Sequence, residues 1–96
     1  MTFYALVFNR SLSRPYKAFH DEFVGNPRIQ RWFHYIKSAY VIGTDMTPRE
    51  LSLHFRKVAD EHNLPKRHFV FQIDLRYHSG WLPNEAWKWV RDNQGQ

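Results

Sequence analysis

The six histidines of this sequence are its most obvious candidates for metal binding, yet their spacing is not that of a metal site. His54 and His62 are eight residues apart in a predicted helix, and the three side chains of the run His20–Glu22 point in diverging directions. The chain has no cysteine, which excludes thiolate-based zinc sites and a thiolate nucleophile. We therefore predict no metal centre and no cofactor, with His20 and His62 at the fringe of the core.

Two carboxylates and five serines complete the set of residues that could take part in catalysis. Asp45 and Asp74 are expected at the same edge of the fold, where they could hold Mg²⁺, although turns and strand ends are the commoner roles for such residues. No serine has a base that the sequence identifies; the five are Ser11, Ser13, Ser38, Ser52 and Ser79. These residues favour a protein that is not an enzyme.

The basic residues form the third candidate group. Fourteen Lys and Arg against nine Asp and Glu give a net charge of +5. Such a balance permits an anionic partner such as nucleic acid, but many basic proteins share it. The positions of the charges must therefore decide whether an anionic partner is indicated.

Alternation and helical spacing predict the elements that position these groups. Strands are expected at residues 3–8, 28–35, 39–44 and 68–75, and helices at 16–24, 47–62 and 83–90. Thr47, Pro48 and Glu50 give the second helix a capping-box start. This order predicts an α+β, ferredoxin-like βαββαβ fold with a four-stranded antiparallel sheet, helices on one face and a short C-terminal helix. The chain is expected to be one domain, 1–96, with a C-terminal extension, 76–96, that packs on the sheet or on a second subunit.

In that topology one edge of the fold collects basic residues. The end of the first strand, the start of the first helix, the hairpin turn and the start of the last strand meet there. Their candidate phosphate-binding residues are Arg10, Arg14, Lys17, Lys37, Ser38, Lys66 and Arg67, with no acid among them. The opposite edge mixes both signs, because it holds Arg28, Asp45, Asp74 and Arg76. A loop rich in Lys and Arg can also serve solubility alone, so phosphate binding is one of two readings of this edge.

Aromatic residues crowd the hairpin RWFHYIKSAYVIGT, residues 31–44, and the tail. Alternation sends Trp32 and His34 to one face of the sheet and Phe33 and Tyr35 to the other. We expect these rings to form core and interface rather than a base-stacking platform, because the hairpin lacks the glycine and aromatic pattern of an RNA-recognition motif. The tail tryptophans Trp81, Trp87 and Trp89 are expected to form a lid or a subunit contact.

The N-terminal run MTFYALVF lacks a basic segment and is too short for a signal peptide or a membrane span. A cytoplasmic protein with no membrane partner is therefore expected.

Residues 32–51, WFHYIKSAYVIGTDMTPREL, resemble the SinR-like small proteins, whose hairpin reads roughly W-h-Y-L-x-S-x-W before a strand ending in Thr and a capped helix. These proteins form a wider group with VapD and the small second subunit of the CRISPR adaptation complex. In element order the resemblance extends over residues 3–73. It implies a ferredoxin-like protomer that dimerises through its sheet and acts either as a metal-dependent nuclease or as a DNA-holding scaffold.

The resemblance also implies roles for particular positions. In the nuclease members an aspartate ends the first strand, and Asn9 stands in that position here. An asparagine lacks the negative charge that Mg²⁺ favours, and it cannot act as a base. Ser38 matches the turn serine and Tyr40 the aromatic of the third strand, whereas PKRHF replaces the acidic residue before the last strand. Both departures favour holding phosphates over cutting them.

Three hypotheses follow. The first is a small, basic, homodimeric and non-catalytic protein that holds RNA or DNA by its phosphates. The second is a metal-dependent endonuclease or ribonuclease, of the toxin or CRISPR-adaptation kind, which would need Mg²⁺. The third is a protein-interaction adaptor that uses the Trp-rich tail.

Overall fold

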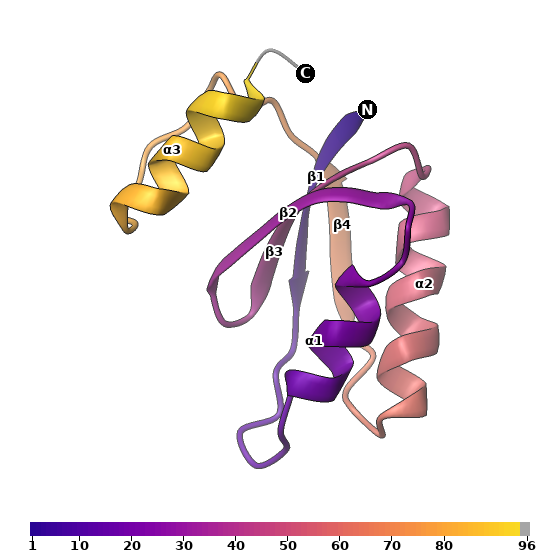
Figure 1. The fold of residues 1–96 in the computed structure, drawn as a ribbon. Helices are drawn as coiled ribbons and strands as arrows, with labels where there is room; N and C mark the ends of the chain where they lie inside the picture. The colour runs from indigo at the N-terminus through magenta and orange to yellow at the C-terminus, as the bar shows by residue number, and fades with distance from the viewer. Residues whose placement is uncertain (95–96) are drawn as a thin grey trace.

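The computed structural model describes residues 1–94 and arranges them as a sheet with helices on both sides (Figure 1). The last two residues of the predicted domain and of its extension, 95–96, lie outside the described residues. The elements in chain order are β1 (Thr2–Phe8), α1 (Lys17–Val24), β2 (Ile29–Ile36), β3 (Ala39–Thr44), α2 (Pro48–Glu61), β4 (His68–Gln72) and α3 (Asn84–Asn93).

The four strands form one antiparallel sheet in the order β2-β3-β1-β4. Leu6 of the central strand β1 lies opposite Tyr40 of β3 on one side and Val70 of β4 on the other. The hairpin strands are therefore neighbours, and the first strand separates them from the last. This arrangement, followed by a C-terminal helix, confirms the predicted ferredoxin-like α+β fold.

The capping box predicted at the start of α2 is present. The Thr47 side chain accepts a hydrogen bond from the backbone N–H of Glu50 at 3.1 Å, and the Glu50 carboxylate accepts one from the Thr47 N–H at 3.0 Å. Pro48 begins the helix, where its missing N–H has no partner to lose. Two otherwise unpaired donors are satisfied within the segment itself, which is why the sequence alone located this helix start.

Helices α1 and α2 cover one face of the sheet and enclose an aromatic core between them (Figure 1). From β1, Leu6 and Phe8 point into it, and from the helices Phe19 and Phe55 meet edge to face at 5.5 Å between ring centroids. Each such fully buried ring contributes about 2–3 kcal/mol relative to an exposed one. The core fixes the helices on the sheet and thereby fixes where the loops between them emerge.

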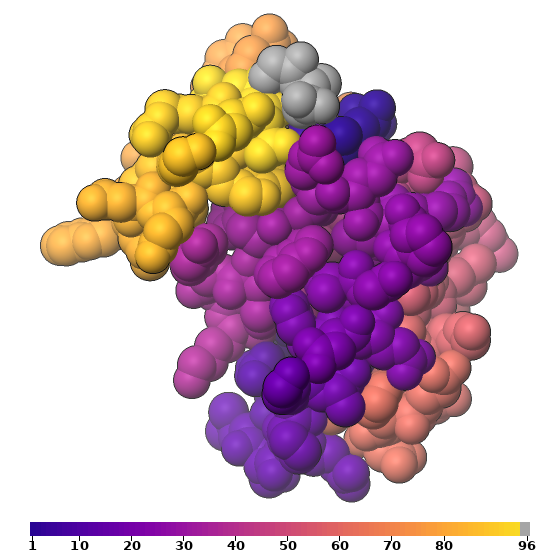
Figure 2. Space-filling view, viewed as in Figure 1, coloured from indigo at the N-terminus to yellow at the C-terminus, as the bar shows by residue number. Residues whose placement is uncertain are grey.

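Helix α3 lies on the opposite face of the sheet, as the space-filling view also shows (Figure 2). Its Trp89 ring packs edge to face on Phe33 of β2 at 4.9 Å and on Phe3 of β1 at 6.0 Å. Gly43 of β3 provides the room, because a Cβ there would come within 2.6 Å of the Phe3 ring. The C-terminal extension thus packs on its own sheet at this end.

Strand β4 ends at Gln72, three residues before the predicted boundary. The Asp74 carboxylate accepts a hydrogen bond from the Arg76 backbone N–H at 2.9 Å, and the Asp74 carbonyl accepts one from Tyr77 at 3.1 Å. An aspartate that binds its own backbone two residues on favours a turn over a strand. The turn breaks the alternation that the apolar residues would otherwise continue.

Within residues 1–94, no helix combines the length and the apolar character that crossing a membrane requires.

Candidate nucleic-acid interface

Three chain segments are tied together at the end of β1 by backbone hydrogen bonds. Phe8 donates its N–H to the Ser38 carbonyl of the hairpin turn at 3.0 Å, and Asn9 donates to the Arg67 carbonyl before β4 at 3.1 Å. The end of the first strand, the hairpin turn and the start of the last strand therefore share one edge, at the end of the sheet away from the N-terminus (Figure 1). This is the juxtaposition predicted from the topology.

Arg10 is held in place at the centre of this edge. Its guanidinium donates to the Lys37 carbonyl at 3.0 Å and lies over the Tyr16 ring at 4.0 Å from the centroid. The Tyr16 hydroxyl in turn accepts from the Ser11 N–H at 2.9 Å. A positioned guanidinium loses less side-chain entropy when it meets an anion than a free one does.

The predicted cations of this edge divide into two groups. Among residues 1–94, Arg10, Arg14, Lys37 and Arg67 form no ion pair. Lys17 is bound to Asp21 at 2.8 Å and Lys66 to Asp60 at 2.8 Å. The predicted set of this edge contains no acid, but α1 and α2 each bring a carboxylate within reach of these two lysines. Both pairs are exposed, and pairs of this kind add little stability.

We call the group of residues Asn9, Arg10, Arg14, Lys37, Ser38 and Arg67 the free edge. Its two non-basic members are polar and lie between the cations: Ser38 in the turn beside Lys37, and Asn9 next to Arg10. Its four cations are the members of the predicted phosphate-binding set that form no ion pair with a carboxylate of residues 1–94.

At the opposite end of the sheet every cation of the predicted mixed set is paired. Arg28 binds Asp45 at 3.0 Å and Glu50 at 2.8 Å. These hydrogen bonds lower the pKa of the Glu50 carboxyl to about 2. Arg76 binds Asp74 at 2.7 Å and lowers the pKa of that carboxyl to about 2 as well. We call these five residues the paired end.

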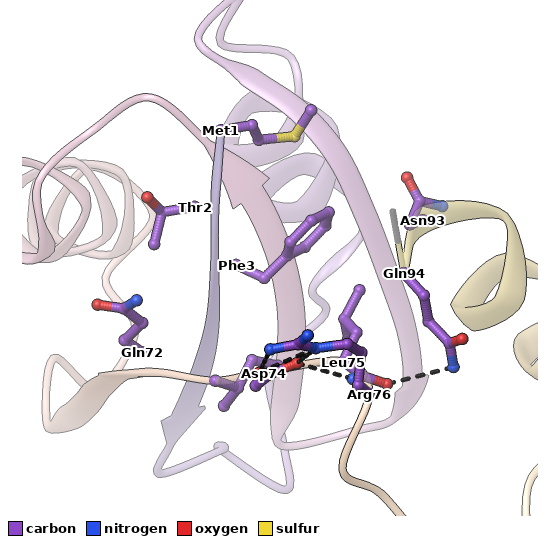
Figure 3. Close-up of a pocket in the computed structure, with 10 residues that line it drawn as sticks. Met1, Thr2, Phe3, Gln72, Asp74, Leu75, Arg76, Asn93 and Gln94 are labelled. Atoms are coloured by element: carbon purple, nitrogen blue, oxygen red, sulfur yellow. Dashed lines mark hydrogen bonds and ion pairs between the residues drawn. The ribbon is translucent and has the colours of Figure 1, made fainter. Parts of the chain in front are cut away.

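A hollow of about 570 Å³ opens at the paired end, between the start of β1, the turn after β4 and the end of α3 (Figure 3). Arg76 and Asp74 lie on its wall, joined to each other by the hydrogen bonds drawn there. The nearby Gln94 side chain donates to the Leu75 carbonyl at 3.4 Å. The two charged side chains that line this hollow, Asp74 and Arg76, therefore bind each other.

The carboxylates considered for Mg²⁺ are the same ones that the arginines hold. Asp45 faces Arg28, and Asp74 faces Arg76. Within residues 1–94, no three His, Cys, Asp or Glu side chains gather in the way that a metal ion requires. Asn9, in the position where the resemblance places a catalytic aspartate, lies at the free edge, where its N–H donates to the Arg67 carbonyl.

The histidines near the sheet are bound within the fold. His20 shares a 2.8 Å hydrogen bond with the Tyr40 hydroxyl, and His34 donates from Nδ1 to the Ala39 carbonyl at 2.7 Å. The His34 ring stacks on Tyr40 at 4.0 Å between ring centroids. Burial lowers the pKa of His34, and the nearby positive charge of Arg10 lowers it further. His20 is partly buried beside the core, as predicted.

One serine does have a histidine partner, which the sequence did not identify. The Ser52 hydroxyl of α2 lies 2.6 Å from Nε2 of His68 at the start of β4, while Nδ1 of that ring faces the Lys66 carbonyl at 2.7 Å. The ring also packs on Phe55 at 4.6 Å. This is the geometry of a nucleophile and its base. Because sixteen residues separate the pair, only the packing of α2 against β4 brings it together.

The tail tryptophans have three different environments. Trp89 packs on its own sheet, and Trp87 stacks beside His78 at 5.5 Å. Trp81 is 98% exposed and projects from the segment before α3. Of the three predicted interface residues, Trp81 is the one whose ring is fully available to another molecule.

Comparison with known proteins adds no relative: no family model, no curated protein and no solved structure matches the chain.

Proposed function

We propose that this protein binds nucleic acid by its phosphates through the free edge, with little dependence on base sequence and without catalysis. The observation that carries the proposal is the contrast in charge pairing: the four cations of the free edge form no ion pair within residues 1–94, whereas those of the paired end are bound to carboxylates. Phosphate contacts of this kind release counterions, which makes the affinity fall steeply with salt.

The hydrogen bonds of the free edge support holding rather than cutting. Arg10 and the backbone at Ser38 and Asn9 are positioned by the fold itself, so the edge is formed before a ligand arrives. Asn9 supplies no charge for a metal ion and no base. Membership of the SinR-like group, suggested by residues 32–51, fits a scaffold better than a nuclease for the same reason.

The protein is proposed to act as a cytoplasmic homodimer. An indole that is 98% exposed is an unusual surface residue, and Trp is among the side chains enriched at the centres of interfaces. Contact through Trp81 would leave the free edge of each copy open. The same residue is what favours the alternative of a protein-interaction adaptor, in which the second molecule is a different protein.

Binding to a labelled 20-nucleotide RNA or DNA over a salt series tests the proposal. The variant R14Q/K37Q/R67Q removes three side chains that donate no hydrogen bond within residues 1–94, so it should fold normally. We expect its affinity to fall at least about tenfold at low salt, and the slope of log affinity against log salt to fall by about two to three. The matched control R31Q/K88Q/R91Q removes the same charge from β2 and α3 and should change both values little.

Two results would overturn the proposal: no binding at 50 mM salt, or equal losses in the two triple variants. Incubation with Mg²⁺ and Mn²⁺ belongs to the same experiment. Metal-dependent cleavage by the natural protein would favour the nuclease alternative, whereas cleavage that appears only with N9D would identify a nuclease that has lost its activity.

A further inference from the structure

Helix α3 covers only part of the sheet face on which it lies. Trp89 closes the end formed by Phe3 and Phe33, but the other end of that face, toward β4, has no covering element within residues 1–94. There Phe69 is 65% exposed and Phe71 is 40% exposed. Two phenylalanines thus stand on the solvent side of an edge strand.

The register shows why these rings do not enter the core. Phe71 lies opposite Ala5 and Phe69 opposite Val7, whereas Val70 lies opposite Leu6 on the helix-covered face. In β4, Val70 is therefore the hydrophobic side chain that packs against the core. The two exposed rings lie side by side, 5.3 Å apart between centroids and tilted by 37°. Contiguous apolar surface is a feature of interaction sites, whereas apolar residues scattered singly over a surface need no such explanation.

The aromatic pair is continuous with the free edge. A groove of about 290 Å³ is lined by both regions: Val7, Phe8, Asn9, Arg67, His68 and Phe69. Arg67 precedes Phe69 by two residues, a spacing of about 7 Å along an extended chain. The hydrogen bond from the Asn9 N–H to the Arg67 carbonyl fixes the backbone at this residue. A positive charge and an aromatic surface therefore adjoin at one groove.

We propose that Phe69 and Phe71 stack on the bases of a single-stranded nucleic acid whose phosphates lie along the free edge. The inference rests on the proposed function and adds to it a substrate class. Proteins that hold single strands combine a cationic track with exposed aromatic rings, because every unpaired base offers a flat face for stacking. In a duplex the bases already stack on one another, so this surface discriminates against it.

Charge argues for a nucleic acid rather than a second copy of this chain as the occupant. A copy seated on the aromatic pair would approach Arg67, which has no ion pair within the described residues, with a molecule of net charge +5. A polyanion instead neutralises that residue as its bases cover the rings.

Fluorescence anisotropy with a labelled 12-nucleotide single strand and the corresponding duplex tests the inference. The variant F69A/F71A should bind the single strand at least about tenfold more weakly, because each stacked base contributes strongly and without regard to sequence. Its duplex affinity and its salt slope should match those of the natural protein. The aromatic variant F69Y/F71Y should restore single-strand binding, and Y77A, which removes an 80% exposed ring from the turn after β4, is the matched control.

The outcomes separate the two proposals. If F69A/F71A binds the single strand as tightly as the natural protein does, stacking is overturned while phosphate binding stands on its salt slope. If the natural protein binds neither nucleic acid at low salt, the proposed function fails instead. If F69A/F71A turns a dimer into a monomer by light scattering and affinity per protomer stays the same, the rings are a dimer contact and the inference is overturned.

Discussion

The free edge carries four basic side chains and the paired end carries two, and the two groups differ in what those side chains contact. At the paired end, the turn after β3, helix α2 and the turn after β4 each supply a carboxylate, and Arg28 and Arg76 are bound by them. At the free edge the nearest partners of Arg10 are a carbonyl oxygen and an aromatic ring, neither of which cancels its charge. Because carboxylates neutralise the cations of the paired end, the excess positive charge of the chain is concentrated at the free edge. The amino-acid composition alone does not show this distribution of charge.

The largest effect should come from freeing the lysines that flank the free edge. The variant D21N/D60N releases Lys17 and Lys66 and is expected to raise affinity for nucleic acid by about tenfold at low salt, with a steeper salt slope. The matched variant D45N/D74N adds the same two charges at the paired end and should raise affinity by less than about threefold, through net charge alone. Equal gains measured by filter binding would contradict the idea of a localised site.

A smaller effect is expected on acid stability, and only at the paired end. Arg28 lowers the pKa of Glu50 to about 2, below its ordinary value near 4.5, so the folded state binds this proton less readily than the unfolded state. The resulting stabilisation is present above about pH 4.5 and is lost as the pH falls toward 2. R28Q should therefore unfold at a higher pH than the natural protein in an acid titration followed by tryptophan fluorescence. The free-edge variant R67Q should leave the midpoint unchanged.

The smallest effect is expected on the pKa of His34, which senses the charge of Arg10 at the free edge. Burial and the charge of Arg10 lower its pKa, so the folded state favours the neutral ring, and stability falls as the pH drops below about 6.5. A bound phosphate should offset the charge of Arg10 and raise the His34 pKa. An NMR titration with and without a short oligonucleotide measures this shift. His54, which bonds to the Phe23 carbonyl away from the edge, is the internal control. A shift equal at both histidines would contradict a local effect.

Part of the charge pairing was readable from the sequence. Lys17 and Asp21 are four residues apart in a predicted helix, the spacing at which side chains on one face meet. The pair between Lys66 and Asp60 bridges the end of α2 and the loop that follows, where no period applies. Ser52 and His68 also meet across two elements. The periodicity of a sequence predicts which side chains are neighbours within one helix or strand. It does not predict which side chains of different elements meet.

The sequence by itself determined the order of the elements, the capped start of α2, the two faces of the hairpin and the meeting of basic loops at one edge. These follow from local rules: side-chain alternation, capping chemistry and the topology that they imply. Tertiary structure decided which cations have a carboxylate partner within residues 1–94. It also decided that the phenylalanines of β4 face solvent while Val70 faces the core. Alternation separates a strand into two sides, but only the elements packed against each side decide which one is buried.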